Sequence, residues 1–141
     1  MFVLFGVASS HVCIHGSLSL VPTTFKFYMR YLTAGHADKK LIMLTSFILE
    51  ESLFSLELAT KWKPSQLAAA SLMIGRHAVG RHKWSPTLLA YSEYREEDII
   101  PVARHMIEAK KNFDWSNLRS VHKKYSGSRK FDAAHIKISN I

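Results

Sequence analysis

KWKPSQLAAASLMIGRHAVGRHKWSP, residues 61–86, is the segment that says most about the architecture of this chain. Pro64 suits the first turn of an α-helix, where its missing N–H needs no partner. No helix breaker follows until Gly75, and the run between them carries small residues on several faces. Small side chains let neighbouring helices approach closely, while larger apolar ones fill the gaps. We therefore predict that this segment is the central helix of a bundle and serves packing rather than chemistry.

The rest of the chain also follows the helical period. Helices are predicted over residues 21–35, 37–58, 64–79, 85–92, 95–111 and 114–127. Their expected caps are Thr23 or Thr24, Asp38, Ser85 with Pro86, and Asp114. The expected inner residues include Phe25, Tyr28, Met29 and Leu32 in the first helix, Leu41 to Phe54 in the second, Ile99 to Ile107 in the fifth, and Trp115, Leu118 and Val121 or His122 in the last. No run alternates like a strand, so the predicted fold class is all-α, with five helices plus an extra C-terminal one.

Composition fits one ordinary domain. The chain has 141 residues, of which 48% are hydrophobic and 21% charged, so it can bury a core. The net charge is +8, and six of these charges come from residues 110–141, which hold eight Lys or Arg and two acids. We interpret this basic end as a solvated helix face and tail, with binding of an acidic partner or nucleic acid as the alternative. The single cysteine, Cys13, excludes an internal disulfide and favours a reducing compartment.

Residues 1–20 differ from everything that follows. They contain no Lys, Arg, Asp or Glu. The apolar start resembles a signal peptide, but it lacks a positive n-region, and its apolar run is too short to span a membrane. As a strand, His11, Cys13 and His15 would share one face, although their spacing is not that of a zinc finger. We treat 1–20 as an unassigned leader that need not be native to the protein.

The acidic side chains form no recognisable active site. Glu50-Glu51 and residues 96–98 are adjacent acids, and adjacent residues on a helix point in different directions. We interpret them as surface and cap groups. The chain has no glycine-rich phosphate loop and no nucleophile elbow. The sequence therefore predicts no catalytic or cofactor-binding residues, no small-molecule substrate, and a protein that is not an enzyme.

The histidines do not suggest a metal site either. His77 and His82 lie five residues apart, not the four that place two ligands on one helical face. His105 and His122 are expected at the edges of the core. No metal-binding residues are predicted.

Five motifs, in order, resemble the C-terminal cyclin domain of B-type mitotic cyclins. The resemblance spans about residues 21–135, with 136–141 as a tail. It implies a five-helix cyclin fold with a last helix and tail packed back on it. The motifs are Pro-Thr at 22–23, Pro-Ser at 64–65 before Leu-Ala-Ala-Ala-Ser, Trp-x-Pro-Thr-Leu at 84–88, the helix start at 94–101 with its internal proline, and Lys-Tyr-Ser-x-Ser-Arg-Lys-Phe at 124–131.

The chain departs from that family in one respect that bears on activity. Full cyclins carry an N-terminal cyclin box with a Met-Arg-Ala-Ile-Leu helix and the residues that grip the kinase. No Met-Arg-Ala-Ile-Leu occurs here, and the MRYL at residues 29–32 belongs to the first helix of the second domain. No kinase-gripping residue can be carried over, so the partner-binding residues are unassigned.

Two functions remain open at this point. The resemblance implies a non-catalytic regulatory module of a cyclin-dependent kinase, in the nucleus and cytoplasm, that binds the kinase weakly or not at all without the first box. The alternative is a cyclin-fold nucleic-acid or transcription-factor-type module that uses the basic C-terminal third. Salt discriminates them, because phosphate binding weakens steeply as salt rises and a packed helix interface does not.

Overall fold

The computed structural model describes residues 23–112 and 119–141, and these residues form helices without any strand. Seven α-helices are present in this part of the chain, followed by two short 3₁₀ turns. The all-α prediction is therefore confirmed. The elements are α2 (Thr24–Ala34), α3 (Lys39–Leu53), α4 (Leu56–Lys61), α5 (Pro64–Ala78), α6 (Pro86–Ser92), α7 (Glu96–Asn112), α8 (Arg119–Tyr125), η2 (Ser128–Lys130) and η3 (Ala133–His135).

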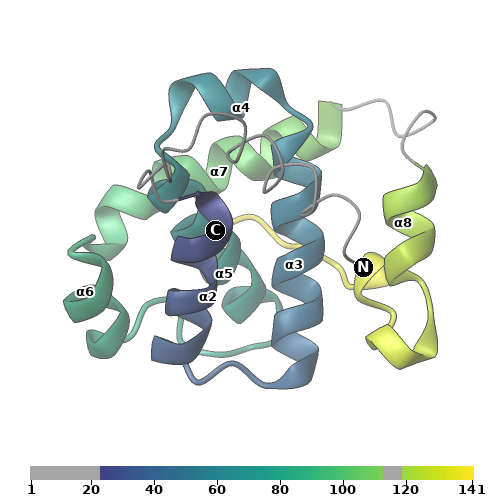
Figure 1. Ribbon diagram of the computed structural model, residues 1–141, viewed down its shortest axis with the longest axis horizontal. Coiled ribbons are helices and arrows are strands. Elements are labelled where there is room, and N and C mark those ends of the chain that lie inside the picture. The colour runs from purple at the N-terminus through teal and green to yellow at the C-terminus, as the bar shows by residue number, and fades with distance from the viewer. Residues whose placement is uncertain (1–22, 113–118) are drawn as a thin grey trace, which may run out of the picture.

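Helix α5 is the centre of the domain, as predicted. It packs against α2, α3 and α7, and α6 and α8 lie at opposite ends of the molecule (Figure 1). Ten consecutive residues of α5, from Leu67 to Arg76, are buried. A helix buried all round needs small residues where its neighbours cross it, and Ala68, Ala69 and Ala70 fill that role with no exposed surface.

Gly75 does not end the central helix, which continues to Ala78. A Cβ at Gly75 would collide with the Thr45 side chain on α3 and lie 3.2 Å from Leu41 Cδ1. The glycine thus permits close approach of α3 and α5. Its role lies in helix–helix packing, which outweighs its low helix propensity.

The two Gly-Arg-His repeats have different structural roles. Arg76 lies within α5, is buried, and donates to the carbonyls of Gly35 (2.9 Å) and His82 (2.8 Å). Burial lowers the pKa of its guanidinium. Arg81 lies in the following loop and pairs with Asp38 at 2.7 Å. Both arginines tie loops together, so the repeat serves the fold.

The second predicted helix is divided in two, which is a correction. Helix α3 ends at Leu53, and Ser55 accepts a hydrogen bond from the N–H of Leu58 to begin α4. A serine side chain that caps a new helix start competes with continuation of the old one. As a result Phe54, which we expected inside, is 37% exposed. Phe25 and Met29 of α2 are also exposed, whereas Tyr28 and Leu32 are buried as predicted.

The predicted caps within the described residues are confirmed. The side chains of Thr23, Asp38 and Ser85 accept from the N–H groups of Lys26, Leu41 and Leu88. In α7, the Asp98 carboxylate accepts from the N–H of Arg95 at 2.9 Å, and Pro101 lies inside the helix. Asp114, Trp115 and Leu118 lie outside the described residues. These local signals place the starts of α2, α3 and α6 where the sequence predicted them.

The C-terminal segment packs back on the bundle. In α8, Val121 is buried and His122 is exposed, so of the two expected inner residues Val121 is the one that faces the core. After η3, Ser139 contacts His77 of α5, and the carbonyl of Ile141 accepts from Arg104 Nε of α7. None of the helices in the described parts is long and apolar enough to cross a membrane.

Candidate protein-binding surface

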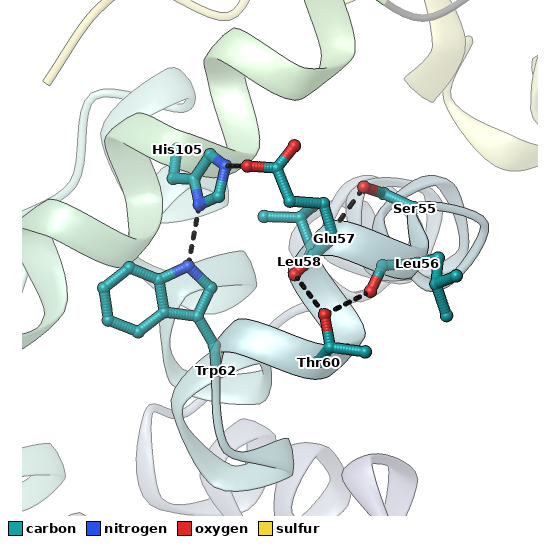
Figure 2. A network of polar contacts seen from close by, with 7 residues as sticks. All are labelled: Ser55, Leu56, Glu57, Leu58, Thr60, Trp62 and His105. Atoms are coloured by element: carbon teal, nitrogen blue, oxygen red, sulfur yellow. Dashed lines mark hydrogen bonds and ion pairs between the residues drawn. The ribbon is translucent and has the colours of Figure 1, made fainter.

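Helix α4 is held against α7 by a short polar network. The indole N–H of Trp62 donates to His105 Nδ1 at 2.8 Å, and His105 Nε2 lies 3.0 Å from Glu57 Oε1 (Figure 2). An indole N–H can only donate, so Nδ1 accepts and the ring proton of the neutral imidazole lies on Nε2, directed at the carboxylate. His105 is half-buried, which agrees with its predicted position at the core edge. The network fixes a helix of only six residues.

This anchoring presents an apolar patch to solvent at the α3–α4 corner. Leu58 points inward and is 1% exposed, whereas Leu56, on the same short helix, is 78% exposed. Leu53 (44%) and Phe54 (37%) precede it at the end of α3. We call these three exposed residues, Leu53, Phe54 and Leu56, the corner patch. A rigid apolar patch on a polar surface is typical of a site that binds another protein.

The structure corrects our interpretation of Glu50 and Glu51 as surface groups. Both are buried on α3. The Glu50 carboxylate accepts from Lys124 Nζ at 2.6 and 2.9 Å and from the Tyr125 hydroxyl at 2.7 Å. Glu51 pairs with Lys110 of α7 at 2.5 Å. The two acids therefore attach α8 and α7 to α3, and their burial requires such partners.

The electrostatics of these pairs follow from burial. Removal from water, together with the neighbouring Glu50 carboxylate, raises the pKa of Tyr125, so its hydroxyl stays protonated and donates. Burial also raises the pKa of Glu51, although Lys110 opposes that shift. Lys110 in addition lies 4.4 Å from the centroid of the Phe47 ring. The pairs are structural and leave no carboxylate poised for catalysis at this place.

Replacing Glu51 with Gln is expected to change the pH dependence of stability. A carboxyl whose pKa is raised on folding binds a proton more readily in the folded state. Its contribution is fully present below its unfolded pKa and is lost as pH rises through the folded pKa. The free energy of unfolding of the parent, relative to Glu51→Gln, should therefore increase as pH falls from 7 towards 4.5.

Urea titrations at a series of pH values measure this difference. Glu108→Gln, which removes an exposed carboxylate of the same helix as Lys110, is the control and should show no such trend. A difference that stays flat, or that shrinks on acidification, would contradict the raised pKa of Glu51.

The histidines that the sequence analysis considered for a metal site have separate structural surroundings. His77, at the end of α5, bonds Ser139 Oγ at 3.1 Å, and His82 is exposed in the next loop. His122 is exposed, although its ring meets the edge of Phe47 with centroids 6.1 Å apart. Over residues 23–112 and 119–141, no three His, Cys, Asp or Glu side chains gather where they could hold a metal ion. The candidates His11, Cys13 and His15 lie outside the described residues.

Sequence reasoning missed the buried acids and the role of Trp62. A usable signal was present for the acids, because Glu50 and Glu51 interrupt a helix that is otherwise apolar nearly all round. Their partners lie 59 to 75 residues away in the chain, which no local pattern reveals.

Comparison with known proteins relates this chain to the cyclins. The family model described as "Cyclin, C-terminal domain" matches residues 22–139. Cyclin-B2-2 of Arabidopsis thaliana is 32% identical over 127 residues, which cover 85% of this chain and 29% of that protein. Cyclin-B2-1 of Oryza sativa subsp. japonica is 36% identical, with 75% and 25% covered. G2/mitotic-specific cyclin-1 of Medicago sativa subsp. varia is 34% identical, with 77% and 26% covered.

The matched segments cover most of this chain but only a small part of each relative. The chain spans under a third of the length of these three relatives. Over that part, helix order, central helix and returning tail agree with the fold that the five motifs implied. None of these findings supports the nucleic-acid alternative. Because the family model covers most of the sequence, the chain belongs to the cyclin family, and the described residues form its C-terminal domain.

Proposed function

We propose that this chain is a non-catalytic cell-cycle regulatory module whose partner is a cyclin-dependent protein kinase, alone or in its assembly. The observation that carries the proposal is the family match along residues 22–139. The printed names of the relatives, among them a G2/mitotic-specific cyclin, favour a role around mitosis. We also propose the nucleus and cytoplasm as its place of action, which the same family membership supports.

The geometry supports binding rather than chemistry. Every fully buried side-chain nitrogen or oxygen of the described residues has a hydrogen-bond partner. Polar groups that are paired within a core stabilise one rigid structure. On that rigid frame, the corner patch is exposed and held in place by the Trp62–His105–Glu57 network. We propose the corner patch as the surface that contacts the kinase assembly.

The proposal also includes weak or absent activation by this chain alone. A ligand shifts a conformational equilibrium only by its differential affinity for the two states. A kinase becomes active when a mobile helix and its activation loop are held in the productive arrangement. The resemblance assigns those contacts mainly to an N-terminal box, and the matched family model is the C-terminal domain. Little differential contact is therefore expected.

A phosphorylation assay tests this expectation. A monomeric cyclin-dependent kinase, already phosphorylated on its activation loop, is titrated with the purified chain to high micromolar concentration, with a full mitotic cyclin as the reference. We expect a rate within about twofold of the kinase alone, against the several orders of magnitude open to a conformational switch. Any weak binding seen by calorimetry should disappear in Leu56→Asp. A rate that approaches the reference would overturn the proposal.

A further inference from the structure

An open pocket lies between α2, the first turn of α5 and the end of α6, away from the corner patch. It has a volume of about 270 Å³ and is lined by Phe27, Arg30, Tyr31, Ser65, Tyr91, Ser92, Glu93 and Tyr94. Few of these residues are apolar, and hydroxyl groups dominate. A pocket of this size and polarity fits a side chain of a peptide with its flanking backbone better than an apolar small molecule.

The inner part of the pocket contains an unpaired hydroxyl. Tyr31 is 3% exposed, and its ring lies beside Phe27 with centroids 6.2 Å apart. No hydrogen bond joins its hydroxyl to another described residue. Fully buried polar atoms of the described residues all have partners, so this oxygen opens into the pocket. A tyrosine whose body is buried and whose hydroxyl has no partner is unusual in a native fold.

Tyr28, one turn earlier on α2, provides the contrast. Its hydroxyl lies within hydrogen-bond distance of the carbonyl of Ile42 (3.0 Å), Thr45 Oγ1 (2.8 Å) and Ser46 Oγ (2.8 Å). The fold thus uses one of these two tyrosine hydroxyls for its own stability and leaves that of Tyr31 free for a ligand.

The opposite wall is rigid. The Tyr94 hydroxyl and Ser65 Oγ are 2.8 Å apart, and the Tyr94 carbonyl accepts from the indole N–H of Trp84 at 2.9 Å. Tyr91 is 58% exposed at the rim, where its ring offers a contact surface. A prepared wall lowers the entropy lost when a ligand binds.

Arg30 supplies the charge. It is exposed, lines the pocket, and forms no ion pair with any described residue. Arg30 and Tyr31 both line the pocket, and the pKa of Tyr31 is raised by burial and by Tyr94, with Arg30 opposing that shift. A guanidinium and a free hydroxyl that line one pocket form a donor set for a carboxylate, which can accept from both. Glu93 also lines the pocket, so a doubly charged phosphate would be poorly balanced there.

We propose that this pocket binds an acidic peptide segment of a partner protein, with one Asp or Glu carboxylate accepting from the Arg30 guanidinium and the Tyr31 hydroxyl. The net charge of +8 would speed the approach of such a segment. This binding goes beyond the proposed function and is measured without any kinase, so the two can fail separately.

NMR titration of the ¹⁵N-labelled full chain tests the proposal. The probe is acetyl-Ala-Leu-Glu-Leu-Ala-amide, and its matched control replaces Glu with Gln. We expect saturable shifts at residues 30–31 and 91–94. The Gln peptide should bind about tenfold more weakly, the loss expected for one charged contact worth 1.4 kcal/mol. Equal affinities for the two peptides, or no shifts up to about 5 mM, would overturn the proposal.

Protein variants separate a binding role from a structural one. Arg30→Ala should weaken Glu-peptide binding about tenfold, whereas Lys26→Ala, the same charge change outside the pocket, should not. Tyr31→Phe should weaken binding about threefold without lowering the melting temperature, and Tyr28→Phe should lower the melting temperature by several degrees without changing binding. A loss of stability in Tyr31→Phe, or unchanged binding in Arg30→Ala, would contradict the assignment.

Charge variants test the choice of a carboxylate. Glu93→Gln should tighten the binding of the Glu peptide about twofold to threefold, because it removes a like charge from the pocket wall. A peptide with phosphoserine at the central position should bind no more tightly than the Glu peptide. If the phosphopeptide bound about tenfold more tightly than the Glu peptide, the ligand of the pocket would be a phosphorylated segment, and the assignment of a carboxylate ligand would be overturned.

Discussion

Leu72→Asp is expected to unfold the domain. Leu72 has no exposed surface, and it lies on the helix that packs against three others. Arg76 lies one turn further along α5, but its guanidinium already donates to the carbonyls of Gly35 and His82, so a new carboxylate would have to disrupt those bonds to gain a partner. An unpaired buried charge costs several kcal/mol, comparable to a domain's whole stability of roughly 5–15 kcal/mol. The helical circular dichroism signal should be largely lost at 25 °C.

Leu56→Asp is the matched control, because it makes the same chemical change at a residue that is 78% exposed. Its melting temperature should lie within a few degrees of the parent. If Leu72→Asp melted within a few degrees of the parent as well, α5 would not be the centre of the core.

Glu50→Ala is expected to give the second largest loss. The substitution leaves the Tyr125 hydroxyl and the Lys124 ammonium without the carboxylate that they share. Removing one member of a buried pair costs roughly 3–5 kcal/mol. We expect about 3 kcal/mol here, since Lys124 keeps 23% of its side chain exposed and can turn to water. The loss should appear as a lower urea midpoint.

Two further variants locate the cause of that loss. Glu50→Gln keeps an acceptor for the Tyr125 hydroxyl and should recover part of the stability. Glu108→Ala, at an exposed position of α7, should change stability by less than about 0.5 kcal/mol. If Glu50→Ala proved as mild as Glu108→Ala, the buried pair would contribute nothing measurable to the attachment of α8.

Helix positions were predictable because their signals are local. The side chains of Asp38 and Ser85 each accept a hydrogen bond from the N–H group three residues later in the chain, so each helix cap is formed within one turn. The small residues of α5 likewise indicated burial on several sides, since an exposed helix does not require them. The all-α class and the central place of α5 could therefore be predicted from the sequence.

Gly75 shows what local reasoning leaves out. The predicted helix over 64–79 runs through this glycine, but only the structure gives the reason for a glycine there: Thr45 of α3 occupies the space that a Cβ would need. The end of α3 also depends on a distant residue. Ser55 begins α4, and the direction of α4 is set by the hydrogen bond from Trp62 to His105 of α7.

The partners of polar side chains could not be predicted at all. Glu50 meets Tyr125 across 75 positions of sequence, and the same residue on a solvated helix would be an ordinary surface acid. Tyr28 and Tyr31 look equivalent in sequence, yet one hydroxyl is paired within the core and the other opens into a pocket. Periodicity and caps act over one or two turns, whereas burial and pairing depend on which helices the folded chain brings together.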